Sequence, residues 1–225
     1  MLKVGLTGGI ASGKSVVGGM FSSLGAQLLQ ADHLAHELMK PGQPVYDEVI
    51  RHFGREILNP DATINRAKLA EIAFGTPTDG SKAVPRIDEL NRIVHPAVIR
   101  HQDEWMQAIG MQERDAVAIV EAALILEAGA GKRFDRLVVV TCGPEERISR
   151  FAGRQKVDFE TARKEVERRM SAQLPDEEKL KAADYVIDNS GSLEHTQEQV
   201  RRVWEKLRAE AALEAGRKIR SSPSS

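Results

Sequence analysis

Short apolar runs alternate along this chain with longer segments in which apolar positions recur every three or four residues. Runs typical of strands buried in a sheet occupy residues 3–7, 116–120 and 137–141, and weaker ones occupy 27–30 and 185–187. Helical patterns separate these runs. Strands that alternate with helices predict an α/β fold with three layers, built on a five-stranded parallel sheet.

The first of these strands leads directly into a glycine-rich loop. Residues 8–15 read Gly-Gly-Ile-Ala-Ser-Gly-Lys-Ser and match the phosphate-loop pattern G-x-x-x-x-G-K-[ST]. An apolar helical pattern begins at Val16. The motif therefore lies between a strand and a helix, which is the context in which such a loop binds the phosphates of a nucleotide.

Each part of the loop has an expected task. Backbone N–H groups would surround the phosphates, and the glycines allow the backbone to curl around them. Lys14 would reach the β- and γ-phosphates, and the Ser15 hydroxyl would bind Mg²⁺. The sequence thus predicts binding of a nucleoside triphosphate with Mg²⁺ by these residues: Gly8, Gly9, Ala11, Ser12, Gly13, Lys14, Ser15 and Val16.

One connection is much longer than a parallel sheet requires. A crossover needs about a dozen residues, whereas residues 32–115 separate the second strand from the third. Their pattern predicts helices over 32–39, 45–53, 66–74, 86–94 and 97–109, with breaks that include residues 76–80 and the His95-Pro96 pair. We expect an inserted helical subdomain that binds a second substrate beside the phosphate loop.

Asp32 follows the second strand immediately. The carboxyl ends of parallel strands line one crevice, so a carboxylate here is expected to point toward the γ-phosphate. There it would orient an attacking hydroxyl and accept its proton. The alternative is that Asp32 only caps the helix that begins at His33. Position alone does not separate the two readings.

Residues 144–169 are rich in arginine. Arg147, Arg150 and Arg154 are spaced three and four residues apart and therefore share one helix face. A solvated helix surface would explain such a run. Beside a phosphate loop, however, phosphoryl transfer needs cations on the transferred group, so we expect a helical lid in which Arg150 or Arg154 contacts phosphate.

Composition and charge narrow the class of protein further. The formal net charge of −1 over 225 residues gives no general attraction to nucleic acid or to anionic membranes. The single cysteine, Cys142, follows an apolar run and is expected to be a buried thiol in a reducing compartment. No stretch is long and apolar enough to span a membrane. We expect a cytoplasmic enzyme with no nucleic-acid or membrane partner, whose residues 207–225 form a helix end and a disordered tail.

Several motifs outside the loop resemble the dephospho-CoA kinase family over about residues 2–206. Besides residues 5–15, they are Ala31-Asp32, Glu37 to Gly42, Leu90 to Pro96, Leu124 to Glu127, Arg150 with Arg154, Ala172 to Pro175 and Ala183 to Gly191. The resemblance implies ATP-dependent phosphorylation of the ribose 3′-hydroxyl of dephospho-CoA. It also implies three parts: a nucleotide core (1–31, 116–142 and 183–206), a helical acceptor-binding part (32–115) and a lid (143–182).

The same resemblance suggests roles for three further residues. His95 is expected near the acceptor, although a histidine before proline can simply hold a turn. Asn189 follows the fifth strand on the adenine side, where a turn would explain it nearly as well. Glu127 could support the acceptor or pair with an arginine. Ala11 replaces a glycine that is usual in the family, and we expect it to be tolerated with a negative φ.

Alternatives to this function remain open at the level of the sequence. The chain lacks the Asn-Lys-x-Asp motif of guanine-specific GTPases, and its third strand ends in Glu121 rather than in the aspartate usual in ATPases of larger machines. A kinase of the nucleoside monophosphate or shikimate type would share the loop. A nucleotide-dependent switch would bind ATP without transferring phosphate.

Overall fold

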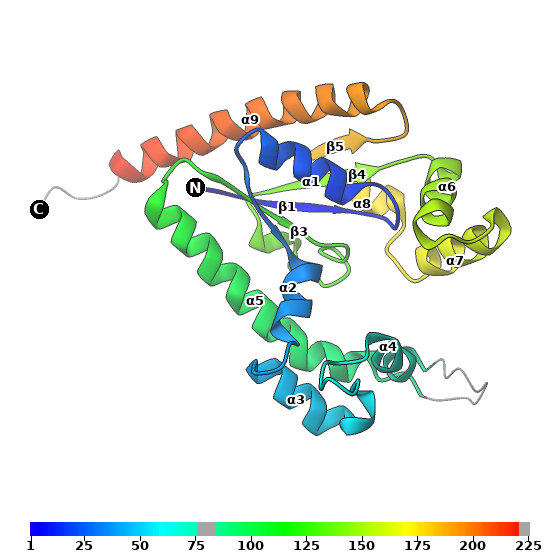
Figure 1. The fold of residues 1–225 in the computed structure, drawn as a ribbon. Coiled ribbons are helices and arrows are strands. Elements are labelled where there is room, and N and C mark those ends of the chain that lie inside the picture. The colour runs from blue at the N-terminus through cyan, green and yellow to red at the C-terminus, as the bar shows by residue number, and fades with distance from the viewer. Residues whose placement is uncertain (76–83, 221–225) are drawn as a thin grey trace, which may run out of the picture. The chain divides into compact units, whose positions relative to one another are not determined.

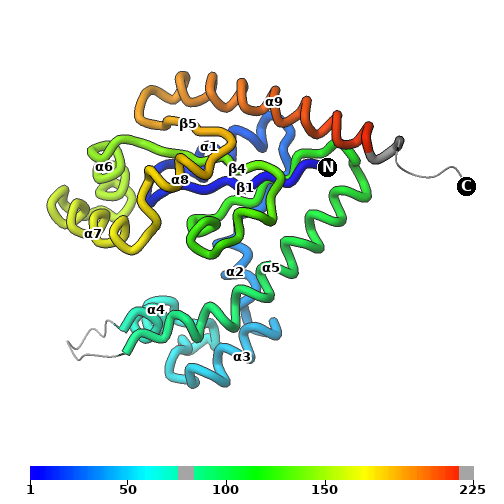
Figure 2. The backbone as a smooth tube through the Cα atoms, turned by 180° about the vertical axis from the view of Figure 1, so that it is seen from behind, coloured from blue at the N-terminus to red at the C-terminus, as the bar shows by residue number. Residues whose placement is uncertain are grey.

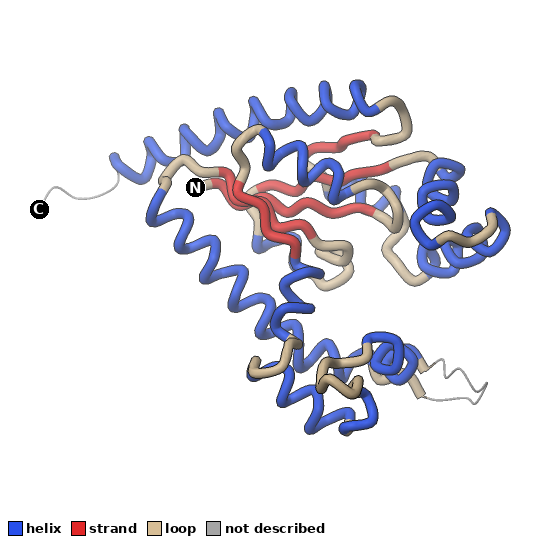
Figure 3. Tube along the Cα trace, in the orientation of Figure 1, coloured by secondary structure: helices blue, strands red, loops and turns tan. Residues whose placement is uncertain are grey.

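The structure is a computed structural model that describes residues 1–75 and 84–220. Its centre is a parallel sheet in the order β2-β3-β1-β4-β5 (Figure 3). The strands are β1 (Leu2–Gly8), β2 (Gln27–Gln30), β3 (Val117–Glu121), β4 (Arg136–Thr141) and β5 (Tyr185–Asp188). The predicted five-stranded parallel sheet is confirmed, and β1, which leads into the phosphate loop, lies at its centre.

Helices α1 (Lys14–Ser23) and α9 (Leu193–Arg220) cover one face of this sheet (Figure 1). Their apolar residues meet those of the central strands in one buried cluster, which contains Leu6, Phe21, Ile119 and Leu207. Burying such side chains contributes about 1.5–3 kcal/mol each. The start of α1 is thereby fixed to the end of β1.

The opposite face of the sheet is covered by shorter pieces. Helix α8 (Asp176–Ala182) lies beside β4 (Figure 2). The segment after β3, which includes a 3₁₀ turn at Ala130–Arg133, adds Ile125 and Phe134 to a cluster with Leu137 and Val139. Both faces of β4 are therefore buried, as its continuous apolar run predicts.

The arginine-rich segment forms two helices, α6 (Pro144–Gln155) and α7 (Phe159–Ser171). Their apolar sides, with Ile148, Phe151 and Val166, pack around Ile10 of the phosphate loop. This segment therefore has a small apolar core of its own, and one loop residue is part of that core.

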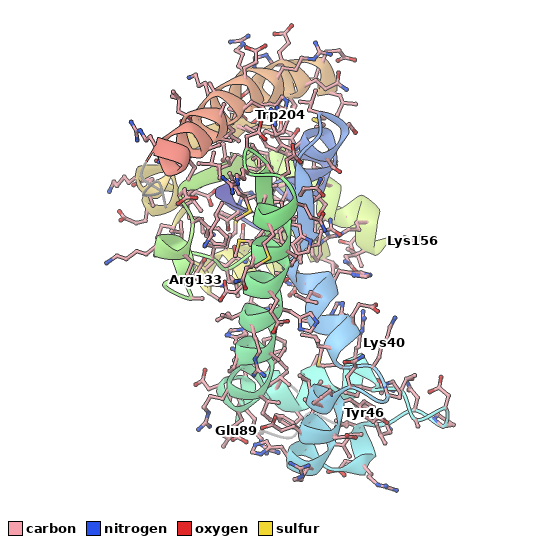
Figure 4. The ribbon with its side chains drawn as sticks, turned by 90° about the vertical axis from the view of Figure 1, so that its left-hand side faces the viewer. Lys40, Tyr46, Glu89, Arg133, Lys156 and Trp204 are labelled. Atoms are coloured by element: carbon pink, nitrogen blue, oxygen red, sulfur yellow. The ribbon has the colours of Figure 1, made fainter. Side chains whose placement is uncertain are left out.

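Residues 31–105 form a second compact unit. It contains α2 (Ala31–Leu38), α3 (Pro44–Phe53), a 3₁₀ turn (Arg55–Ile57), α4 (Arg66–Phe74) and most of α5 (Ile87–Gln112). The Tyr46 hydroxyl on α3, labelled in Figure 4, donates a hydrogen bond to the carbonyl of Ala62. Residues 76–83, which include the predicted break at 76–80, lie outside the described residues.

The predicted helix break at His95-Pro96 is wrong. Helix α5 continues through Pro96, which lies in its interior. A proline inside a helix removes one hydrogen bond and costs about 3 kcal/mol. Val94 and Val98 are both buried on either side of the proline, and their burial offsets that cost.

The predicted helix end after residue 206 is confirmed, but the tail expected from about residue 216 is wrong as far as residue 220. Helix α9 continues to Arg220, and Leu207, Ala211 and Ala215 are buried along it. The apolar spacing of three to four residues that anchors α9 therefore extends past residue 206. Residues 221–225 lie outside the described residues. Among the residues described, no helix has the length and apolar character needed to cross a membrane.

Candidate active site

The phosphate loop lies between β1 and α1. Gly13 has φ 91° and occupies the N-cap position of α1, and the N–H groups of Val16 and Val17 bond to its carbonyl. The Lys14 ammonium donates to the carbonyl oxygens of Gly8 at 2.9 Å and Gly9 at 3.2 Å. The lysine side chain is thus folded over the loop, and the first turn of α1 directs its dipole to the same place.

Ser15 is linked to a carboxylate that the sequence reasoning left out of the site. Its hydroxyl donates to Glu121 Oε1 at 2.6 Å, and the Gln30 amide donates to Glu121 Oε2 at 3.0 Å. Glu121 is the last residue of β3 and is only 7% exposed. The position of Glu121 at the end of a continuously apolar strand could have indicated this residue from the sequence. That strand, β3, pairs directly with β1, which leads into the phosphate loop.

Asn189 is hydrogen-bonded to the backbone of the phosphate loop. Its amide donates to the Ser12 carbonyl at 2.9 Å and accepts from the Thr196 hydroxyl at 2.9 Å. Ser12 and Asn189 are both buried. The predicted turn is formed by Asp188, the preceding residue. Its carboxylate accepts hydrogen bonds from the N–H and the hydroxyl of Ser190. The Asn189 side chain itself fixes the shape of the phosphate loop.

Ala11 departs from our expectation of a negative φ. Its φ is 53°, in the left-handed region that a side chain disfavours. The strain amounts to about 1–2 kcal/mol. Ala11 nevertheless packs partly against the cluster that Ile10 forms with α6 and α7, and this packing helps to hold the loop in a conformation that the sequence alone disfavours.

The two arginines that we expected to contact phosphate have different surroundings. Arg150 is half-buried and donates to the carbonyls of Asn189 at 2.7 Å and Ser12 at 3.4 Å. It also lines an open surface pocket of about 380 Å³, together with Glu146 of α6 and Phe159 of α7. Arg154 is exposed, and its guanidinium lies 6.0 Å from the centre of the Phe151 ring. Of the two, Arg150 touches the phosphate loop.

Glu127 forms a buried ion pair with a lysine rather than with an arginine. Its Oε1 lies 3.0 Å from Lys179 Nζ and accepts from the backbone N–H of Leu174. The Lys179 side chain is 1% exposed. This pair joins the segment after β3 to α8. The arginine partner considered in the sequence analysis is corrected to Lys179.

Asp32 and His95 belong to the 31–105 unit, and both are exposed. Asp32 lies in the first turn of α2, inside the helix rather than at a cap before it. One turn later, burial and the Arg66 charge lower the pKa of His36, while the Asp32 carboxylate acts in the opposite direction. His36 is therefore a neighbour of Asp32, and Arg66 is a neighbour of His36; the sequence reasoning singled out neither.

Cys142 has the predicted character of a structural thiol. It is buried at the end of β4, and burial raises the pKa of the thiol above its ordinary value, against the opposing effect of Arg147 and Arg150. A raised pKa keeps the thiol protonated and unreactive. Among the described residues, no group of three or more potential His, Cys, Asp or Glu ligands could hold a metal ion.

Comparisons with known proteins agree with this architecture. The family model described as dephospho-CoA kinase matches residues 2–195. A dephospho-CoA kinase of Aquifex aeolicus is 41% identical over 212 residues, which are 92% of this chain and 98% of that protein. Among solved structures, a Thermus thermophilus protein has a TM-score of 0.72 at 30% identity and covers 92% of this chain and 97% of its own. The dephospho-CoA kinase from Campylobacter jejuni has a TM-score of 0.64 at 24% identity, with 92% and 98% covered.

Proposed function

Because the chain belongs to the dephospho-CoA kinase family, we propose that it transfers the γ-phosphoryl group of ATP to the ribose 3′-hydroxyl of dephospho-CoA, giving coenzyme A and ADP. The observation that carries the site assignment is the linked set Lys14, Ser15 and Glu121, at the junction of β1, β3 and α1. A cation, a hydroxyl and a buried carboxylate lie close together there, and groups of these kinds bind a nucleoside triphosphate and its metal.

The donor set supports Mg²⁺ as the metal. Magnesium prefers oxygen ligands and is usually held by one or two carboxylates or hydroxyls together with substrate phosphates and water. Ser15 Oγ and Glu121 provide such oxygens 2.6 Å apart. We propose Ser15 as the direct ligand and Glu121 as the residue that orients it. When bound, the ion would neutralise charge on the β- and γ-phosphates.

The chain's own residues then have distinct roles in the transfer. Backbone N–H groups of the loop hold the phosphates, and Lys14 exchanges its carbonyl partners for phosphate oxygens and stabilises the charge that develops on them. Asp32 orients the 3′-hydroxyl and accepts its proton as the oxygen attacks phosphorus. Most of the acceleration comes from positioning and charge, since the protein forms no covalent bond to the phosphoryl group.

The remaining candidate residues are assigned to the nucleotide or to the acceptor. Arg150 and Arg154 form the cationic side of the lid on the nucleotide, and Asn189 keeps the loop in its binding shape. His95 and Glu127 are proposed for the acceptor side. In the case of Glu127 this role is indirect, because its carboxylate is engaged by Lys179.

The test is ADP release from ATP and Mg²⁺ with dephospho-CoA, compared with no acceptor, AMP and shikimate. We expect ADP to form only with dephospho-CoA, and coenzyme A to appear in equal amount. Transfer to AMP or shikimate instead would assign another small-molecule kinase. Tight ATP binding without transfer to any acceptor would favour a nucleotide-dependent switch and would contradict the role of Asp32.

A further inference from the structure

Arg147 is a buried arginine near the start of α6, and the roles given above do not use it. It is 1% exposed. Its Nη2 donates to Asp176 Oδ2 at 2.6 Å and to the Cys142 carbonyl at 3.3 Å. Its Nε and Nη1 atoms are also buried, but neither has a hydrogen-bond partner within the described residues. Burying a cation with two unpaired donor atoms costs free energy, and an oxygen ligand that accepts from these atoms would remove that cost.

The guanidinium lies against the phosphate loop at Gly9. A Cβ atom built on Gly9 would lie 2.3 Å from Arg147 Nη1 and 3.3 Å from Asp176 Oδ1. The φ of Gly9 is outside the left-handed region. Glycine is therefore needed here for space, since Arg147 fills the volume of a side chain. Lys14 donates to the carbonyl of the same residue, so two cations converge on Gly9.

We propose that Arg147 is a second cationic contact for the terminal phosphate of ATP, beside Lys14. The inference rests on the proposed function, because it requires ATP in the phosphate loop. Nε–H and Nη1–H donate to phosphate oxygens, while Asp176 orients the guanidinium through Nη2. The arginine is already out of water, so its contact with phosphate needs little further desolvation, which is the condition for strong electrostatic stabilisation.

The alternative is that the Arg147–Asp176 pair only ties α6 to α8. The two interpretations differ in what they expect of Asp176. If the pair is purely structural, removal of either partner has the same effect on nucleotide binding. If Arg147 binds phosphate, loss of the arginine weakens ATP binding, whereas loss of the nearby negative charge of Asp176 does not.

The experiment is calorimetric titration of the full-length protein with Mg²⁺ and either ATP or ADP, without acceptor. ADP lacks the terminal phosphate and therefore serves as the internal reference. We expect R147Q to lose about 10-fold or more in ATP affinity, the usual worth of a charged hydrogen bond, and much less in ADP affinity. D176N should retain or increase ATP affinity. The matched control is R163Q, because Arg163 is a lid arginine whose partner is Glu145 at 3.6 Å; it should leave both affinities unchanged.

Equal losses for ATP and ADP in R147Q, or the same loss in R147Q and D176N, would overturn the proposal. If R147Q does not fold, as judged by circular dichroism, R147K takes its place. It keeps the charge but loses the forked donors, and a selective loss of ATP affinity is again expected. Failure of the proposed function is distinguishable, because the unaltered protein would then bind no ATP or would fail to phosphorylate dephospho-CoA. A phosphorylating enzyme with an unselective R147Q variant would refute only the role of Arg147.

Discussion

The two compact units present their candidate residues in opposite ways. In the unit formed by residues 1–30 and 106–225, Ser15, Glu121 and Asn189 are joined to other side chains or to the loop backbone by hydrogen bonds. In the unit formed by residues 31–105, Asp32 and His95 lie exposed on helices. The proposed nucleotide side is thus organised by hydrogen bonds within the protein, whereas the proposed acceptor side has side chains that are accessible from solution.

This difference agrees with the roles proposed for the two sides. Groups that stabilise charge in phosphoryl transfer are most effective when they are fixed before the substrate arrives and are shielded from water. A general base must instead reach the proton of an incoming hydroxyl. Buried supporting contacts are therefore expected around the phosphates, and exposed carboxylates are expected where the acceptor enters.

The largest effect should come from Asp32→Asn. We expect turnover to fall by about 10²–10⁴-fold, the usual contribution of a positioned base, while ATP affinity changes little because the nucleotide-side contacts remain. Steady-state kinetics combined with ATP titration measures both quantities. His33→Gln changes the adjacent exposed residue of α2 and serves as the matched control. A D32N enzyme with nearly normal turnover would remove Asp32 from the mechanism.

Glu121→Gln should have the next largest effect, because it alters the contact that orients Ser15. We expect the Mg²⁺ concentration needed for half-maximal activity to rise by about 10–100-fold, as is typical when a supporting contact to a metal ligand is lost. Excess Mg²⁺ should restore much of the rate. Gln30→Ala removes the contact to the other carboxylate oxygen and should cause a smaller shift in the same direction. An unchanged Mg²⁺ requirement in E121Q would place the metal elsewhere.

The nucleotide side could be predicted closely from the sequence, because backbone geometry and short-range spacing determine it. The order of strand, glycine-rich loop and helix leaves few arrangements for Lys14 and Ser15. The contacts of Glu121 and Arg147 could not be predicted in the same way. They depend on the register of strands far apart in sequence and on the packing of α6 and α8 against the loop, which no local pattern encodes.

Two of the local predictions that failed did so because packing outweighed a backbone preference. Pro96 disfavours a continuous helix, but buried valines on both sides favour it. Ala11 disfavours a positive φ, but the packing around Ile10 accommodates it. In both cases the local cost is a few kcal/mol at most, which burial of a few apolar side chains can exceed.

Two glycines test how rigid the nucleotide side is. Gly13 has φ 91°, and a Cβ atom there would lie 2.1 Å from the buried Asn189 amide. Gly13→Ala should therefore lower the free energy of unfolding by about 2 kcal/mol or more, from strain and displacement of that amide. Gly19→Ala is the matched control in α1, where a Cβ atom meets nothing within 4 Å; it should raise stability by about 0.5–1 kcal/mol. Denaturant unfolding measures both, and a well-tolerated G13A would mean that the loop is not held by Asn189.

The smallest effect, on stability in acid, compares one ion pair in each unit. In the 31–105 unit, hydrogen bonds from Arg86 and then His52 lower the pKa of Glu89 from 4.5 to about 2. On α7, hydrogen bonds from Arg168 and then Arg169 lower the pKa of Glu165 to about 2. A carboxylate whose pKa is lower in the folded state stabilises the protein above its ordinary pKa, and this contribution is lost as the pH falls from about 4.5 to about 2.

E89Q and E165Q should therefore each have a slightly lower urea midpoint than the unaltered protein at pH 7, and the differences should shrink below pH 4. A difference that stays undiminished as the pH falls from about 4.5 to about 2 would show that the glutamate acts through packing rather than through charge. Both carboxylates titrate over the same pH range. If only one variant loses its difference in urea midpoint, the charge of that glutamate contributes to stability and the charge of the other does not.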